Sequence, residues 1–159
     1  MREDGFNLEL RKAGKVGEEG KELPDKVLTA DIISAAIAVH RALGPGFLES
    51  IYEEALCVEL ASRNLPFERQ RTLRLTYLGK PIGEHRLDLL VAGRVVVELK
   101  AVKALESVHF AIVRSYLKAV PAESGLLLNF AAMPLTIKRV GRERLPLSCL
   151  PEFQIHSDQ

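Results

Sequence analysis

The spacing of apolar residues predicts two helices in the first part of the chain. From Leu28 to Leu43, apolar residues such as Ile32 and Ala36 recur at three- and four-residue intervals, which is the spacing of one helical face. The sequence Gly44-Pro45-Gly46 then ends the helix, because proline cannot continue it. A second helix with a broad apolar face is predicted from Phe47 to about Asn64.

After this second helix the pattern changes to alternation and to β-branched runs, which predict strands. One more helix interrupts them, and Gly79-Lys80-Pro81 is the predicted turn between the first two strands. The predicted elements are strands at Phe67–Leu78, Ile82–Val91 and Arg94–Ala101, a helix at Ser107–Ala119, and strands at Gly125–Phe130 and Leu135–Val140.

The order of these elements predicts a single α/β domain of the α+β type with a mixed sheet. The three-strand meander pairs antiparallel, and the helix before the next strand permits a crossover, so helices cover the sheet. A chain of 159 residues suits one domain with a core of its own. We expect a domain at residues 25–145, a flexible N-terminal arm at 1–24 and a C-terminal tail at 146–159.

Composition narrows the function classes. Hydrophobic residues make up 47% and charged residues 27%, as in an ordinary globular protein, and the net charge of +1 provides no long-range field for nucleic acid. Any nucleic-acid contact must therefore depend on a local basic patch. The two cysteines, Cys57 and Cys149, form no CxxC pair, which favours a reducing, cytoplasmic compartment. We see neither a signal peptide nor a membrane-spanning run, and so expect no membrane association.

Two acidic residues, Asp88 and Glu98, are predicted to face each other across a hairpin. If the loop comprises residues 92–94, counting back from it places Asp88 directly opposite Glu98. Opposed side chains on one sheet face are about 5 Å apart at Cβ. Lys100 lies two residues beyond Glu98 and projects from the same face. A two-residue loop would shift the pairing by one residue and weaken this geometry.

This arrangement of charges indicates a metal site. Two close carboxylates repel each other unless a cation neutralises them, and hard oxygen ligands suit Mg²⁺ or Mn²⁺. Such an ion can activate water and stabilise charge on a phosphoryl oxygen, while Lys100 orients the water or neutralises developing charge. The alternative is a solvated strand face with a surface ion pair. The apolar run Val95–Val97 favours the metal site, because a charged acid in a buried strand is costly unless it is paired or binds a metal.

Several blocks in this order resemble the GxxExxY protein family. Gly46–Tyr52 matches the pattern that names the family, and the resemblance extends from about Leu28 to Val140. It implies membership in the PD-(D/E)XK nuclease-like superfamily, with a restriction-endonuclease-like core of helix, three strands, helix and strand, here with an extra N-terminal helix. The other resembling blocks are Arg86–Val91, Val96–Val102, Gly125–Phe130 and Ile137–Arg139.

The resemblance implies roles for individual residues. Asp88 and Glu98 would be metal ligands, Lys100 the catalytic lysine, and Glu49 a further acid that the helix adds to the site. A glutamate in a first helical turn also favours the helix dipole, so Glu49 has a structural alternative. Tyr52 lies one turn beyond Glu49 and would either support the site or belong to the core.

Further residues carry weaker expectations. His40 is a possible supporting residue, although a lone histidine on an apolar face is more often structural. Family members often carry Gln on the helix after the Glu-x-Lys strand, where this chain has Ile112, which lacks an amide that could position a phosphate. Possible nucleic-acid contacts, which could equally be solvated surface charges, are Arg69, Arg71, Arg74 and Arg86.

Three functional hypotheses follow from these residues. The first is a divalent-metal-dependent nuclease that cleaves DNA or RNA at Asp88, Glu98 and Lys100. The second is a catalytically weak or inactive module of the same fold that binds nucleic acid or a protein partner, which Ile112 favours. The third is a homo-oligomeric scaffold that uses exposed parts of the first helix as its interface.

Overall fold

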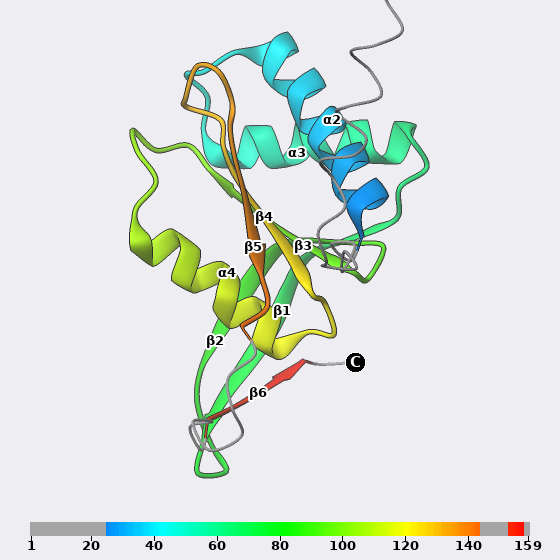
Figure 1. The fold of residues 1–159 in the computed structure, drawn as a ribbon. Coiled ribbons are helices and arrows are strands. Elements are labelled where there is room, and N and C mark those ends of the chain that lie inside the picture. The colour runs from blue at the N-terminus through cyan, green and yellow to red at the C-terminus, as the bar shows by residue number, and fades with distance from the viewer. Residues whose placement is uncertain (1–24, 144–152, 158–159) are drawn as a thin grey trace, which may run out of the picture.

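Up to residue 141, helices and strands follow one another in the order that the sequence predicts, and one further strand follows in the predicted tail. The structure is a computed structural model that describes residues 25–143 and 153–157. Figure 1 shows the helices grouped around one twisted sheet. The elements are α2 (Lys26–Leu43), α3 (Glu49–Ser62), β1 (Phe67–Tyr77), β2 (Lys80–Val91), β3 (Val95–Lys100), α4 (Ser107–Ala119), β4 (Ser124–Asn129), β5 (Thr136–Gly141) and β6 (Phe153–Ser157).

The sheet is mixed, which confirms the predicted fold class. Its strand order is β5-β4-β3-β2-β1-β6. Strands β1, β2 and β3 form an antiparallel meander, whereas β3 and β4 are parallel and are connected through α4. A parallel pair needs such a crossover. This places β3 in the interior of the sheet, where every residue from Val95 to Leu99 is buried.

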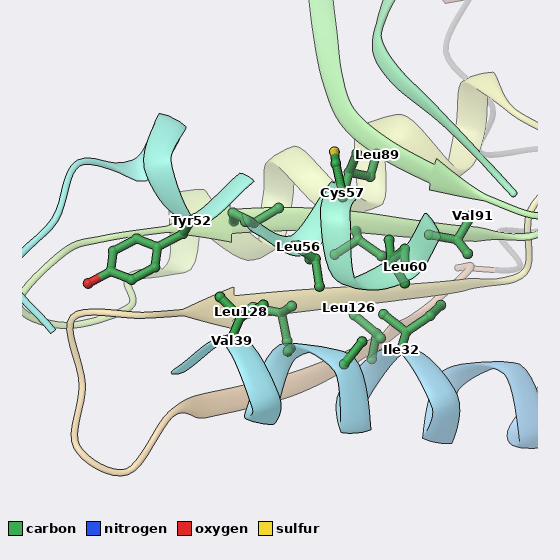
Figure 2. Close-up of a cluster of buried hydrophobic side chains, with 14 of the residues drawn as sticks. Ile32, Val39, Tyr52, Leu56, Cys57, Leu60, Leu89, Val91, Leu126 and Leu128 are labelled. Carbon is green, nitrogen blue, oxygen red and sulfur yellow. The ribbon is translucent and has the colours of Figure 1, made fainter. Parts of the chain in front are cut away.

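Alternating side chains of the inner strands build a core on each face of the sheet. Val95, Val97 and Leu99 of β3 pack with α2 and α3, whereas Val96 packs with α4. Figure 2 shows the first of these clusters, in which side chains of α2 lie beside Leu126 and Leu128 of β4. Both faces of β3 are therefore covered, as its near-continuous apolar run predicted.

Some predicted boundaries were wrong. The second helix begins at Glu49 and ends at Ser62, because Leu48 at its N-cap has an extended backbone (φ −69°, ψ 150°). The turn between β1 and β2 consists of Leu78 and Gly79, both at positive φ (48° and 75°), so Lys80 already belongs to β2. A two-residue turn with two positive φ values matches the twist of a hairpin.

The structure describes only part of the predicted N-terminal arm and C-terminal tail: none of the arm, and residues 153–157 of the tail. Residues 1–24 and Cys149 lie outside the described residues. Within the predicted tail, Phe153–Ser157 form β6, which pairs antiparallel with the outer edge of β1. Cys57, the cysteine that is described, is a free buried thiol. None of the helices in residues 25–143 has the length and apolar character that a membrane crossing requires.

Candidate metal and catalytic site

The hairpin of β2 and β3 has the three-residue loop on which the predicted site depends. Val91 pairs with Val95, and Leu89 pairs with Val97. The loop turns through Ala92 and Gly93, which have φ values of 51° and 66°. The predicted register of this hairpin is therefore confirmed up to Leu89.

One residue before Leu89, the two strands separate. The antiparallel pairing between β2 and β3 ends at Leu89 and Val97, so Asp88 and Glu98 are not a ladder pair. Instead, the Leu99 N–H donates a 2.9 Å hydrogen bond to Asp88 Oδ2. The Asp88 carboxylate thus occupies the position that a strand carbonyl would otherwise take, and it lies beside Glu98 at the point where the strands separate.

We call the point where β2 and β3 separate, with Asp88, Glu98 and Lys100, the fork. Glu98 and Lys100 form a close ion pair there. Lys100 Nζ donates to Glu98 Oε1 at 2.6 Å, and the Glu98 residue is only 4% exposed. The second oxygen of the ionised carboxylate, Glu98 Oε2, is buried and has no hydrogen-bond donor among residues 25–143, whereas protonation would allow a hydrogen bond between Glu98 and Asp88. A buried acceptor without a partner is costly, so this oxygen can readily accept a proton or a cation.

When no cation is present, the surroundings of Asp88 and Glu98 favour a proton on one of these two acids. Burial, followed by the nearby charge of Asp88, raises the pKa of Glu98 to about 8. Burial also raises the pKa of Asp88, although the Leu99 N–H opposes that shift. Burial alone would lower the pKa of Lys100, but its bond to Glu98 raises it, so the ammonium stays charged.

Glu49, the first residue of α3, comes close to this group from another element. Burial raises the pKa of its carboxyl group, while the positive charge of Lys100 and a hydrogen bond from the Ala101 backbone lower it. The charge of Asp88 also acts on Glu49. The structure therefore brings Asp88, Glu98 and Lys100 together, and Glu49, in the first turn of α3 as expected, lies near enough for the charges of Lys100 and Asp88 to affect its pKa.

The donor set fits a hard divalent cation held by two carboxylates. Within the described parts of the chain, no three His, Cys, Asp or Glu side chains form a ready ligand group. Mg²⁺ is often held by one or two carboxylates and keeps several of its waters. Asp88 and the partnerless Glu98 Oε2 meet that requirement. Glu49 as a third ligand stays a prediction.

Tyr52 is a core residue that secures the loop before α3. Its hydroxyl donates to the Gly44 carbonyl at 2.6 Å and accepts the Phe47 N–H at 3.2 Å. Its ring is fully buried and stacks on Phe130 with a centroid distance of 4.7 Å. Figure 2 shows the hydroxyl pointing away from the aliphatic cluster. Tyr52 thus secures the loop that leads into Glu49, and its role in supporting the site stays a prediction.

Replacing Tyr52 by phenylalanine should weaken this loop. The Tyr52→Phe variant leaves the Gly44 carbonyl and the Phe47 N–H without their shared partner. We expect a loss of about 1–2 kcal/mol in the free energy of unfolding, measured by urea denaturation. Tyr77, which is 51% exposed, offers a matched control, and Tyr77→Phe should change stability by less than about 0.5 kcal/mol. Equal losses in the two variants would contradict this assignment.

The contacts of His40 are with the segment that follows β4. His40 is buried, and its Nε2 is 2.9 Å from the Ala132 carbonyl oxygen, which accepts its hydrogen bond. Its ring also contacts Phe130 at a centroid distance of 6.1 Å. These contacts connect α2 to the segment after β4 and give His40 a structural role, while a supporting role in the site stays a prediction.

The four arginines predicted to contact nucleic acid are mostly engaged with the protein's own acids. Arg69 bridges Glu53 and Glu54. Arg86 is exposed, and its carbonyl accepts the Tyr116 hydroxyl at 2.8 Å. A phosphate would have to compete with the carboxylates for most of these cations. The remaining ion pairs are Arg71 with Glu68 at 3.5 Å and Arg74 with Glu84 at 3.8 Å.

Two site residues were missed by the sequence analysis. Glu53 lies one turn beyond Glu49 and is buried, with Arg69 Nε donating to its Oε1 at 2.6 Å. Gln70 Nε2 donates to Glu53 Oε2 at 2.8 Å and lies 3.4 Å from Asp88 Oδ1. The four-residue spacing of Glu49 and Glu53 places both on one helix face, and this was a usable signal. No sequence signal marked Gln70.

Ile112 behaves as a core residue of α4. It is partly buried against the cluster that α4 forms with the sheet. Its apolar side chain brings no amide to the fork, so the departure noted in the sequence is also a chemical difference in the structure. An amide does reach Asp88 from another element: it is that of Gln70, which also contacts Glu53 of α3.

Comparison with known proteins gives one match. A family model described as the PD-(D/E)XK nuclease superfamily matches residues 26–140, which is most of the chain. Neither the curated proteins nor the solved structures contain a significant match. The matched range includes every residue of the fork, and together with the element order it confirms the restriction-endonuclease-like fold. The narrower GxxExxY assignment stays a prediction.

Proposed function

The chain belongs to the PD-(D/E)XK nuclease superfamily, and from this premise we propose that it hydrolyses phosphodiester bonds in DNA or RNA with Mg²⁺ or Mn²⁺. The observation that carries the proposal is the buried, partnerless Glu98 Oε2 beside Asp88 and Lys100. A purely structural ion pair would not need a second, half-buried acid next to it. When both acids are ionised, two carboxylates and one ammonium have a net negative charge, which favours the binding of a cation.

Each residue of the fork has a distinct role in this proposal. Asp88 and Glu98 would hold the cation, with Glu49 as the third acid. When bound, the cation would polarise a phosphoryl oxygen and make a water molecule more acidic. Lys100, held by its bond to Glu98, would orient the attacking water or neutralise charge on the phosphate. The buried walls of β3 keep the local dielectric low, which strengthens these interactions.

Nucleic acid is the proposed substrate because the superfamily consists of nucleases. The net charge of +1 means that binding depends on local contacts. Arg86 is exposed and lies two residues before Asp88 in sequence, which makes it a candidate contact close to the acid pair. Arg69, Arg71 and Arg74 would have to exchange a carboxylate partner for a phosphate.

A cleavage panel beside Lys100→Ala tests the proposed activity. Single- and double-stranded DNA and RNA are incubated with the protein in Mg²⁺, in Mn²⁺ and in a chelator. We expect metal-dependent cleavage of at least one substrate, and a loss of about 10²- to 10³-fold in Lys100→Ala. Lys103→Ala is the matched control, because Lys103 is exposed. Equal rates for Lys100→Ala and the wild type would contradict the role of Lys100.

A second function has a specific observation in its favour. Ile112 packs against the core and offers no polar group to a phosphate, which is compatible with a catalytically weak or inactive module that binds nucleic acid or a protein partner. Tight nucleic-acid binding without turnover in any metal would support this module and exclude the nuclease. The oligomeric scaffold also stays a prediction, which light scattering would test.

A further inference from the structure

Gln70 lies directly across the strand pair from Asp88. In the pairing of β1 with β2, Arg69 faces Leu89 and Arg71 faces Leu87. Gln70 and Asp88 are the intervening residues, and they are missing from the regular pairing. The backbone of Gln70 is left-handed, with a φ of 53°. The regular pairing of β1 and β2 is thus interrupted at Asp88, the acid that β2 contributes to the fork.

The left-handed conformation of Gln70 has no local explanation in the backbone. Side chains other than glycine pay about 1–2 kcal/mol for this region of φ and ψ. The other non-glycine residues with positive φ in the described parts of the chain lie at helix ends or in hairpin turns, whereas Gln70 lies within a strand. Strain of this kind persists where surrounding interactions hold it, often at functional sites. The comparison residues are Asp25, Asn64, Leu78 and Ala92.

The side chain of Gln70 supplies the interactions that could hold this conformation. Its amide nitrogen donates to Glu53 Oε2 at 2.8 Å and lies 3.4 Å from Asp88 Oδ1. Carboxylates only accept hydrogen bonds, so the amide must present its NH₂ group, which has two hydrogens to share. Since the other Glu53 oxygen is occupied by Arg69, Glu53 is a fixed support.

These contacts leave Asp88 between two donors. The Leu99 N–H occupies Oδ2 and the Gln70 amide approaches Oδ1. The amide also lies between the carboxylates of Asp88 and Glu53, where a donor to both relieves the repulsion of like charges. We propose that Gln70 is a positioning residue that sets the orientation of Asp88 for metal binding. Its metal-binding consequence rests on the proposed function, whereas its effect on Asp88 itself does not.

Two substitutions separate this role from a structural one. Asparagine and glycine both accept left-handed backbone more readily than glutamine. Gln70→Asn has an amide that is one methylene shorter, and Gln70→Gly has none. In both variants the relief of backbone strain offsets the lost or weakened hydrogen bond to Glu53, so the melting temperature should change little while Asp88 is released. Ala92→Gly relieves the same kind of backbone strain, at a φ of 51° in a turn, and is the matched control.

The test measures Asp88 with and without metal. In the metal-free protein, the hydrogen exchange of the Leu99 amide, followed by NMR, reports its bond to Asp88 Oδ2. We expect up to about fivefold faster exchange in Gln70→Asn and Gln70→Gly, no change in Ala92→Gly, and the largest effect in Asp88→Ala. Calorimetric titration with Mn²⁺ alone should show affinity about 10- to 100-fold weaker in the two Gln70 variants.

The outcomes distinguish the two proposals. Unchanged Leu99 exchange in both Gln70 variants, with faster exchange in Asp88→Ala, would overturn the role of Gln70 whatever the metal does. Faster Leu99 exchange in the Gln70 variants, in a wild-type protein that binds no Mn²⁺, would support the positioning of Asp88 and overturn the metal-dependent function. A lower melting temperature with unchanged exchange would make Gln70 a structural residue only.

Discussion

Replacing Asp88 or Glu98 by alanine is expected to reduce divalent-metal affinity by at least about 100-fold, because each removes a proposed ligand of the cation. Changes to residues that only orient a metal ligand already reduce metal affinity by about 10- to 100-fold. Cleavage should fall by about 10³-fold or more, since both the positioning of water and the neutralisation of phosphate charge depend on the ion. Calorimetry with Mn²⁺ and the rate of nucleic-acid cleavage measure the two effects.

The folding of these variants must be separated from their chemistry. Glu98→Ala leaves Lys100 without its partner, and Asp88→Ala leaves the Leu99 N–H without an acceptor. The isosteric variants Asp88→Asn and Glu98→Gln keep the shape of each side chain, and circular dichroism monitors their fold. Glu84→Ala is the matched control, because Glu84 is an exposed acid of the same strand that pairs with Arg74. Unchanged Mn²⁺ affinity in both alanine variants would contradict the site.

The metal-free protein is expected to lose stability as the pH rises from about 5 to 8. Burial and the charge of Asp88 raise the pKa of Glu98 from 4.5 to about 8. Between these values the unfolded chain has released the proton, whereas the folded protein still holds it. The folded state therefore binds more protons, and its stability falls with pH by up to roughly 1.4 kcal/mol per pH unit. Asp88, whose pKa is also raised, contributes with the same sign.

Glu98→Gln should remove most of this loss, because its amide carries no proton that is released in this range. Urea unfolding at pH 5, 6.5 and 8 in a chelator compares the variant with the wild type, and the difference between them should grow with pH by a few kcal/mol. Saturating Mg²⁺ should restore the wild type at pH 8, where the ionised pair binds it best. Parallel pH profiles for the two proteins would contradict the raised pKa.

The sequence predicted the fork best where local rules decide the structure. The length of the loop after Val91 could be predicted, and counting back from it placed Asp88 near Glu98. The structure also has these two residues near each other. The buried run Val95–Val97 identified β3 as an interior strand, since both of its faces are covered. What counting could not predict is that the ladder ends at Leu89, so that Asp88 reaches the backbone of Leu99 instead of facing Glu98.

The remaining differences depend on contacts that are distant in sequence. Gln70 meets Glu53 and Asp88 from 17 and 18 residues away, and no pattern in β1 indicates its left-handed backbone. The role of Tyr52 depends on the shape of the loop at Gly44. Strand β6 is short and gains its place only by pairing with the edge of β1. Such strands are specified by their partner more than by their own sequence.

Anomalous diffraction from crystals of the wild-type protein soaked in Mn²⁺ tests the central claim most directly. The fork predicts one manganese peak in contact with a carboxylate oxygen of Asp88 and with Glu98 Oε2, the buried oxygen that has no protein partner in the described residues. The peak should vanish in crystals of Asp88→Asn. A peak elsewhere on the protein, or none at the fork at saturating Mn²⁺, would contradict the proposed metal site.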